Sequence, residues 1–155
     1  MSESIIENLK KEIIKAGEAR SQESYEEAYD RVFEYLDVLE EQLGKTRYLQ
    51  GNLVGEDDKK LYEILLRFDT VYYFKNRLNR NTLRDFDNLW NYARDLYEIP
   101  KYRQLADFKK IKNDMLLGTE EENPYRIVAL GPDEAFWQQK NNRDEKFPIN
   151  RDEVN

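Results

Sequence analysis

The chain has 155 residues, the size of one domain, with a formal net charge of −7 and no cysteine or histidine. The acidic balance and scattered basic residues exclude a nucleic-acid-binding stripe, and no apolar run is long enough for a transmembrane helix. Without cysteine or histidine the chain cannot supply a thiolate nucleophile or an imidazole base. We therefore expect a cytoplasmic protein without nucleic-acid or membrane partners.

Apolar residues recur at helical spacing in the first part of the chain. Residues 4–16 predict a first helix that Gly17 ends. Residues 21–43 predict a long second helix that Gly44 ends, with an apolar residue every three or four positions from Tyr25 to Leu43. This pattern favours a long helix in a bundle, since its three heptads are the lower limit for a coiled coil.

A third helix is predicted from Asp58 to about Lys75, after a turn in which Gly51 can adopt a positive φ. Its first turn holds three acidic residues, where unpaired amides and the helix dipole favour negative charge. Calcium loops need alternating ligands and a distal Glu, which this run lacks. The cluster, Glu56, Asp57 and Asp58, therefore predicts a helix start and not a cation site.

Two further helices complete the predicted bundle. One begins at Thr82, with Asp85 three residues later, and is broken by Pro100. The last covers residues 105–117 and is closed by Gly118. Because no segment before residue 118 alternates with period two, we expect an all-α domain of about five helices over residues 1–117.

Residues 118–155 show no sustained periodicity and predict an irregular tail. We expect this tail to lie across the helices, with its last ten or so residues frayed. It could bind a partner or simply cover apolar surface, and the sequence leaves both open. The expected anchors are Tyr125, Ile127, Val128, Leu130, Phe136 and Trp137.

Five segments of the chain form a series with a recognisable order and spacing: KAGEA (15–19), RYLQGN (47–52), RFDTVY (67–72), DLYEIP (95–100) and FKKIKND (108–114). Together they resemble the glutathionyl-hydroquinone reductases, which are xi-class, omega-like glutathione S-transferases. The resemblance covers residues 5–117 and implies a bundle like the C-terminal domain of a glutathione S-transferase. In that family an N-terminal thioredoxin-like domain holds glutathione and the catalytic cysteine. The resemblance thus implies that this chain matches only the helical half and binds no cofactor alone.

The chain departs from the family pattern at several positions, also at Glu18 and at residues 76–78, and three of the departures bear on the ligand or on folding. The resemblance places quinone-facing tyrosines where Ile14 and Met115 stand, and a Ser or Thr helix cap where Gly55 stands, three residues before Asp58. Glycine at a helix cap costs only a few tenths of a kcal/mol relative to the preferred residues, so we expect the domain to fold. The resemblance carries over no catalytic, cofactor-binding or metal-binding residue.

Two functional hypotheses follow. In the first, the chain is a stand-alone helical domain, catalytically silent alone, that acts as an interaction or small-ligand module and could form a homodimer. In the alternative, it is the helical subunit of a split reductase, completed by a separate thioredoxin-like chain that brings glutathione. The chain could also be part of a longer protein.

Overall fold

The computed structural model describes residues 2–148, with side chains from residue 5 onward. This range contains five α-helices of nine or more residues, three shorter ones and no β-strand, which confirms the predicted all-α bundle. The helices are α1 (Ser2–Glu18), α2 (Gln22–Leu43), α3 (Glu56–Leu66), α4 (Tyr73–Lys75), α5 (Asp87–Tyr97), α6 (Pro100–Arg103), α7 (Phe108–Leu116) and α8 (Arg143–Lys146).

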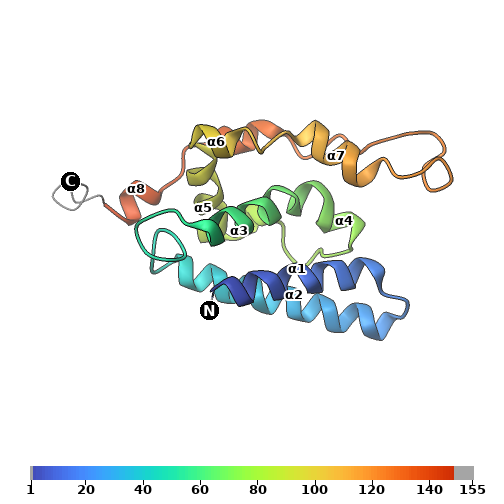
Figure 1. Ribbon diagram of the computed structural model, residues 1–155, viewed down its shortest axis with the longest axis horizontal. Coiled ribbons are helices and arrows are strands. Elements are labelled where there is room, and N and C mark those ends of the chain that lie inside the picture. Colours follow the sequence, from blue (N-terminus) through green and yellow to red (C-terminus); the bar gives the residue numbers. More distant parts are fainter. Residues whose placement is uncertain (1, 149–155) are drawn as a thin grey trace.

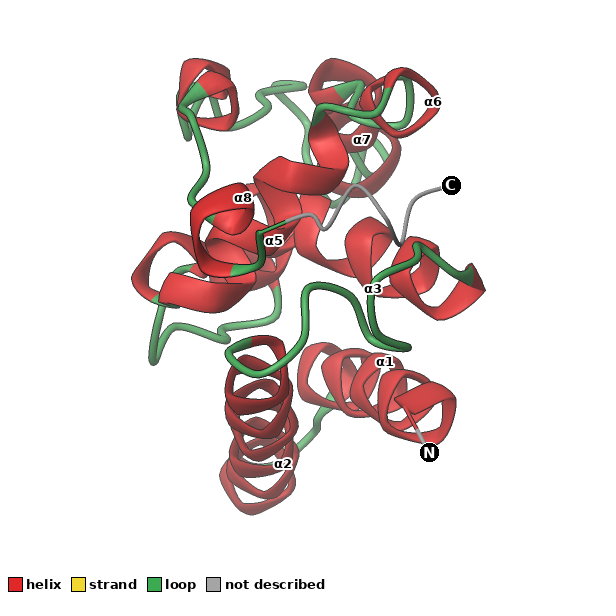
Figure 2. Cartoon of the chain, turned by 90° about the vertical axis from the view of Figure 1, so that its left-hand side faces the viewer, coloured by secondary structure: helices red, strands yellow, loops and turns green. Residues whose placement is uncertain are grey.

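The helices lie in three tiers, seen from two directions in Figures 1 and 2. The antiparallel pair α1 and α2 forms the first tier, and α3 and α5 form the second. The third tier consists of α6 and α7. Buried apolar residues from all five long helices join in one core, so the helices form a single packed body.

The first helix does not end where the sequence predicts. It continues through Gly17 to Glu18. A Cβ at Gly17 would come within 2.7 Å of Nδ2 of Asn76, and this amide donates a hydrogen bond to the Ile13 carbonyl at 2.9 Å. Gly17 therefore permits close packing and does not stop the helix. The second helix starts after the Ser21 cap and ends at Gly44, as predicted.

The predicted single helix from Asp58 to Lys75 is wrong, because a π-helix interrupts it. After α3 ends at Leu66, residues Phe68–Tyr72 form a π-helix that leads into α4. The amides of Val71 and Tyr72 both donate to the Arg67 carbonyl, at 2.9 and 3.0 Å. Such π-turns occur often at functional sites, and this one leaves Tyr72 half-buried beside a fully buried Val71.

The predicted starts of the last two long helices also need correction. Thr82 and Asp85 bound a 3₁₀ turn, and α5 begins only at Asp87. The last helix begins at Phe108, because the Asp107 side chain accepts from the Lys110 amide and caps it there. The predicted break at Pro100 is confirmed: this residue starts α6, where its missing amide costs nothing.

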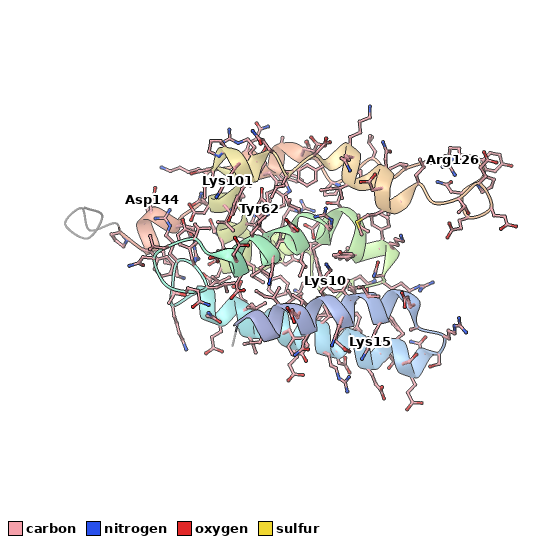
Figure 3. The ribbon with its side chains drawn as sticks, in the orientation of Figure 1. Lys10, Lys15, Tyr62, Lys101, Arg126 and Asp144 are labelled. Atoms are coloured by element: carbon pink, nitrogen blue, oxygen red, sulfur yellow. The ribbon has the colours of Figure 1, made fainter. Side chains whose placement is uncertain are left out.

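Residues 119–131 form a loop that projects away from the helices, with Arg126 near its tip (Figures 1 and 3). Three predicted anchors are wrong: Tyr125, Ile127 and Leu130 are 85%, 71% and 94% exposed. The loop is held by its own hydrogen bonds, including that of the Asn123 side chain to the Ile127 carbonyl at 2.8 Å. These hydrogen bonds therefore hold the loop in shape while Tyr125, Ile127 and Leu130 stay exposed. The expected frayed end concerns residues 149–155, which lie outside the described residues.

The following part of the tail does pack on the helices. Trp137 is 7% exposed, and its ring lies 5.0 Å from Trp90 and 5.6 Å from Phe108, centroid to centroid. Phe136 is half-buried against the same core. Aromatic pairs at these distances add stability beyond their buried area, so Trp137 is the main apolar anchor of the described tail.

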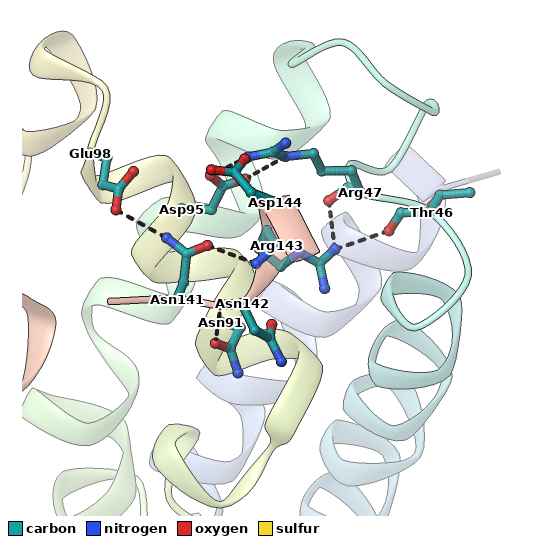
Figure 4. A network of polar contacts seen from close by, with 9 residues as sticks. All are labelled: Thr46, Arg47, Asn91, Asp95, Glu98, Asn141, Asn142, Arg143 and Asp144. Carbon is teal, nitrogen blue, oxygen red and sulfur yellow. Dashed lines mark hydrogen bonds and ion pairs between the residues drawn. The ribbon is translucent and has the colours of Figure 1, made fainter. Parts of the chain in front are cut away.

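A buried group of charged residues holds α8 in place. The Arg143 side chain is fully buried and donates to the Leu43 carbonyl at 2.9 Å. It also donates to the carbonyls of Thr46 and Arg47, at 3.0 and 2.7 Å (Figure 4). Arg47 in turn makes a two-point contact with Asp95, at 2.8 and 3.0 Å. Arg143 thereby satisfies carbonyls at and beyond the C-terminal end of α2, where no helical partner exists.

The start of α3 joins this group. The Asp58 carboxylate is fully buried and accepts from the amides of Leu49 and Gly55 and from the Tyr92 hydroxyl, at 3.0, 2.8 and 2.7 Å. The Arg143 guanidinium lies 6.0 Å from the centre of the Tyr92 ring. We call these five side chains, Arg47, Asp58, Tyr92, Asp95 and Arg143, the polar core.

Candidate functional site

A cleft of about 470 Å³ opens between α1 and α3, and we call it the α1–α3 cleft. Its volume lies in the range of small-molecule sites. The π-helix and α7 contribute one lining residue each. The lining residues are Ile6, Glu7, Lys10, Lys60, Glu63, Ile64, Arg67, Tyr72 and Met115.

Helical spacing explains how the charged residues come to share the cleft. Glu7 and Lys10 lie three positions apart on α1, and Lys60 and Glu63 have the same spacing on α3; residues three or four apart project from one face of a helix. Ile6 and Ile64 also line the cleft but are only 2% and 5% exposed. The cleft therefore has polar walls above a partly apolar floor.

The charge of the cleft differs from that of the whole chain. Three cations and two carboxylates line it, a formal charge of +1, whereas the chain carries −7. Among residues 5–148, Lys10 has no ion-pair partner, and Figure 3 shows it between α1 and α3. Arg67 donates from Nη1 to the Glu63 carbonyl at 2.8 Å, so its contact is with a backbone group and not with a carboxylate.

Tyr72 and Met115 complete the cleft. Burial raises the pKa of the Tyr72 phenol, against an opposing influence of Arg67, so the hydroxyl is neutral near pH 7 and can donate or accept. Met115 is half-buried, and its polarisable thioether suits contact with an aromatic ring. Lys75 donates to the Met115 carbonyl and ties this end of α7 to α4. These features favour an aromatic ligand.

The structure separates the two positions that the resemblance linked to the quinone. Met115 lines the cleft, but Ile14 is 46% exposed on α1 and is not among the lining residues. The helix-start positions Gly55 and Asp58 lie at the start of α3, where Asp58 belongs to the polar core and accepts from the Gly55 amide. Of the predicted site residues, the structure thus places only Met115 in the cleft.

Sequence reasoning missed Lys10, Arg67 and Tyr72 as one group. Arg67 and Tyr72 bound the segment RFDTVY, so the family resemblance contained a signal for both. Lys10 had no such signal, because its proximity to α3 depends on how the two helices pack. The acidic cluster Glu56–Asp58 lies in the first turn of α3, as predicted.

Comparison with known proteins identifies the class of this domain. Residues 22–95 match the family model "Glutathione S-transferase, C-terminal domain". The chain is 36% identical over 146 residues to the glutathionyl-hydroquinone reductase YqjG of Escherichia coli. The aligned region covers 92% of this chain and 43% of that protein. The chain is 30% identical to the reductase PcpF of Sphingobium chlorophenolicum, over 83% of this chain and 41% of that protein.

A solved structure supports the same assignment. The glutathione-bound structure of E. coli YqjG superimposes with a TM-score of 0.83 and 36% identity, over 92% of this chain and 46% of that one. The chain therefore contains the C-terminal helical domain of the glutathione transferase fold. It is similar to the helical half of the glutathionyl-hydroquinone reductases, and it spans less than half the length of these relatives.

Two features are absent from the described part of the chain. No helix within it is long and apolar enough to span a bilayer. No group of three or more acidic side chains is arranged there to hold a metal ion.

Proposed function

We propose that this chain is a ligand-binding helical domain that holds a small aromatic ring in the α1–α3 cleft and is catalytically silent by itself. The cleft is the observation that supports the proposal, since it combines an apolar floor with Met115 and the Tyr72 phenol. Because the chain is similar to glutathionyl-hydroquinone reductases, we expect the aromatic ligand to be a hydroquinone.

Glutathione fits this chain only in part. It carries two carboxylates, an ammonium group and a thiol. The cleft offers Lys10 and Arg67 to a carboxylate, but the chain has no cysteine to exchange with the thiol. Thiol exchange therefore lies beyond the chain's own residues, and glutathione would be held by a thioredoxin-like domain.

The purified chain tests the proposal in two measurements. Incubated with glutathione and a glutathionyl-hydroquinone, it is expected to release no free hydroquinone above the protein-free background. Titrated with hydroquinone, it is expected to show shifted methyl resonances for Ile6, Ile64 and Met115. Turnover above background would contradict the silence, and unshifted methyl groups would contradict ring binding.

The second candidate function is a helical subunit that completes a glutathione-dependent reductase. The specific observation is that the chain matches only 43% of the length of YqjG, in the C-terminal domain. A separately produced thioredoxin-like protein is then expected to co-purify with this chain and to restore hydroquinone release. Failure of the two to associate would contradict this candidate. A homodimer and a cytoplasmic location stay predictions, and sedimentation analysis of the purified chain tests the first.

A further inference from the structure

Two cations of the α1–α3 cleft lack a carboxylate partner, although the chain as a whole is acidic. Lys10 makes no ion pair within residues 5–148, and Arg67 donates to the Glu63 backbone carbonyl. Some arginines elsewhere pair with acids, as Arg80 with Asp37, and others, such as Arg143, donate to backbone carbonyls as Arg67 does. An anion entering the cleft would therefore meet two cations that make no ion pair with a carboxylate of residues 5–148, in a lining of formal charge +1.

The remaining lining residues define what such an anion is attached to. Met115 is half-buried and offers its thioether to a flat ring, above the nearly buried Ile6 and Ile64. The carboxylates of Glu7 and Glu63 line the walls, and an ionised carboxylate can only accept hydrogen bonds. A ring hydroxyl can donate a hydrogen bond to either carboxylate.

We propose that the α1–α3 cleft binds a hydroxylated aromatic ring that carries an anionic substituent. The anion lies between Lys10 and Arg67, the ring rests on the apolar floor, and a ring hydroxyl donates to Glu7 or Glu63. This inference rests on the proposed function and narrows its ligand to hydroquinones that bear a negative charge on the ring.

A matched pair of ligands tests this charge preference. The full chain, labelled with ¹⁵N, is titrated at low salt with 2,5-dihydroxybenzoate and with hydroquinone, which differ by one carboxylate. We expect 2,5-dihydroxybenzoate to bind about tenfold more tightly, since each cation contributes a modest, partly screened attraction. The affected amide resonances are expected to surround Lys10 and Arg67.

Three variants show whether the named cations cause the preference. Lys10→Met and Arg67→Met are each expected to reduce the preference for 2,5-dihydroxybenzoate over hydroquinone to about threefold or less. Lys11→Met is the control, because Lys11 is the next residue on α1 and does not line the cleft. Lys10 is exposed, so its variant should fold, and circular dichroism checks all three.

The outcomes separate this inference from the proposed function. Equal Kd values for the two ligands, or a preference that survives in Lys10→Met, overturn the inference and leave ring binding standing. Binding of neither ligand overturns the proposed function as well. A tenfold preference that falls in Lys10→Met and persists in Lys11→Met supports the inference.

Discussion

The polar core and the α1–α3 cleft both gather charged side chains, but they use them in opposite ways. In the polar core Arg143 and Asp58 are fully buried, and each makes three hydrogen bonds to the protein. In the cleft Lys10 is exposed and has no ion-pair partner within residues 5–148. Buried charges must be paired or hydrogen-bonded to be tolerated. Charges beside an open cleft remain available to a ligand.

This difference assigns separate roles to the two regions. Removing one member of a buried polar network leaves its partners unsatisfied, and this cost appears as lost stability. Removing an exposed charge changes stability little, so its effect should appear in binding. The following predictions test this contrast, from the largest expected effect to the smallest.

Asp58→Ala is expected to have the largest effect, a loss of about 3–4 kcal/mol in the free energy of unfolding. The substitution leaves the Leu49 and Gly55 amides and the Tyr92 hydroxyl without their acceptor. Urea denaturation measures the loss. Asp57→Ala is the control in the same helical turn and should lose less than about 1 kcal/mol. Similar losses for both variants would show that the buried carboxylate has no special role.

Arg143→Met is expected to lose about 2–3 kcal/mol, because three carbonyls at the end of α2 lose their donor. The buried Nε of Arg143 has no partner in the structure, so losing it costs nothing and limits the effect. The exposed Arg20→Met is the control and should change stability by less than about 0.5 kcal/mol. Amide exchange in residues 133–147 should accelerate in Arg143→Met alone.

Alkaline pH should destabilise the protein through its buried tyrosines. Burial raises the pKa of Tyr92 well above 10 and that of Tyr48 to about 12. Above pH 10 the unfolded chain therefore releases protons that the folded chain keeps, and stability falls by about 1.4 kcal/mol per pH unit for each such tyrosine.

Tyr92→Phe tests that effect. It removes the contribution of one tyrosine, so the loss of unfolding free energy between pH 10 and 11 should be about 1 kcal/mol smaller than in the wild type, because the unfolded tyrosine is only half deprotonated at pH 10. Denaturation at stepped pH values measures the slope. Tyr125→Phe, on the projecting loop, should keep the wild-type slope. A wild-type slope in Tyr92→Phe would contradict the buried, neutral phenol.

Lys10→Met should have the smallest effect on stability, a change of less than about 0.5 kcal/mol. The reason is that Lys10 is exposed and has no ion-pair partner among residues 5–148. Thermal denaturation of Lys10→Met, compared with that of Lys11→Met, measures this change in stability. A loss above about 1 kcal/mol would show that Lys10 supports the fold, and it would remove the contrast between the cleft and the polar core.

The fold could be predicted from the sequence because its signals are local. The spacing from Tyr25 to Leu43 places apolar residues on one face of a helix, and Ser21 and Gly44 mark its ends. Local signals failed where tertiary contacts compete with them. A glycine such as Gly17 usually marks the end of a helix, but here α1 continues through it. The glycine is needed because the Asn76 side chain packs too close to leave room for a Cβ.

The sequence by itself determined the all-α class, the order of the helices and the absence of a cysteine nucleophile. Only the tertiary structure decided which charges are buried in the polar core and which line the cleft. Arg143 and Lys10 look alike as isolated cations, since nothing near either in the sequence separates them. Their difference comes from contacts made across the chain, for Arg143 with carbonyls about 100 residues away. Helical periodicity cannot encode such contacts, because it describes one helix at a time.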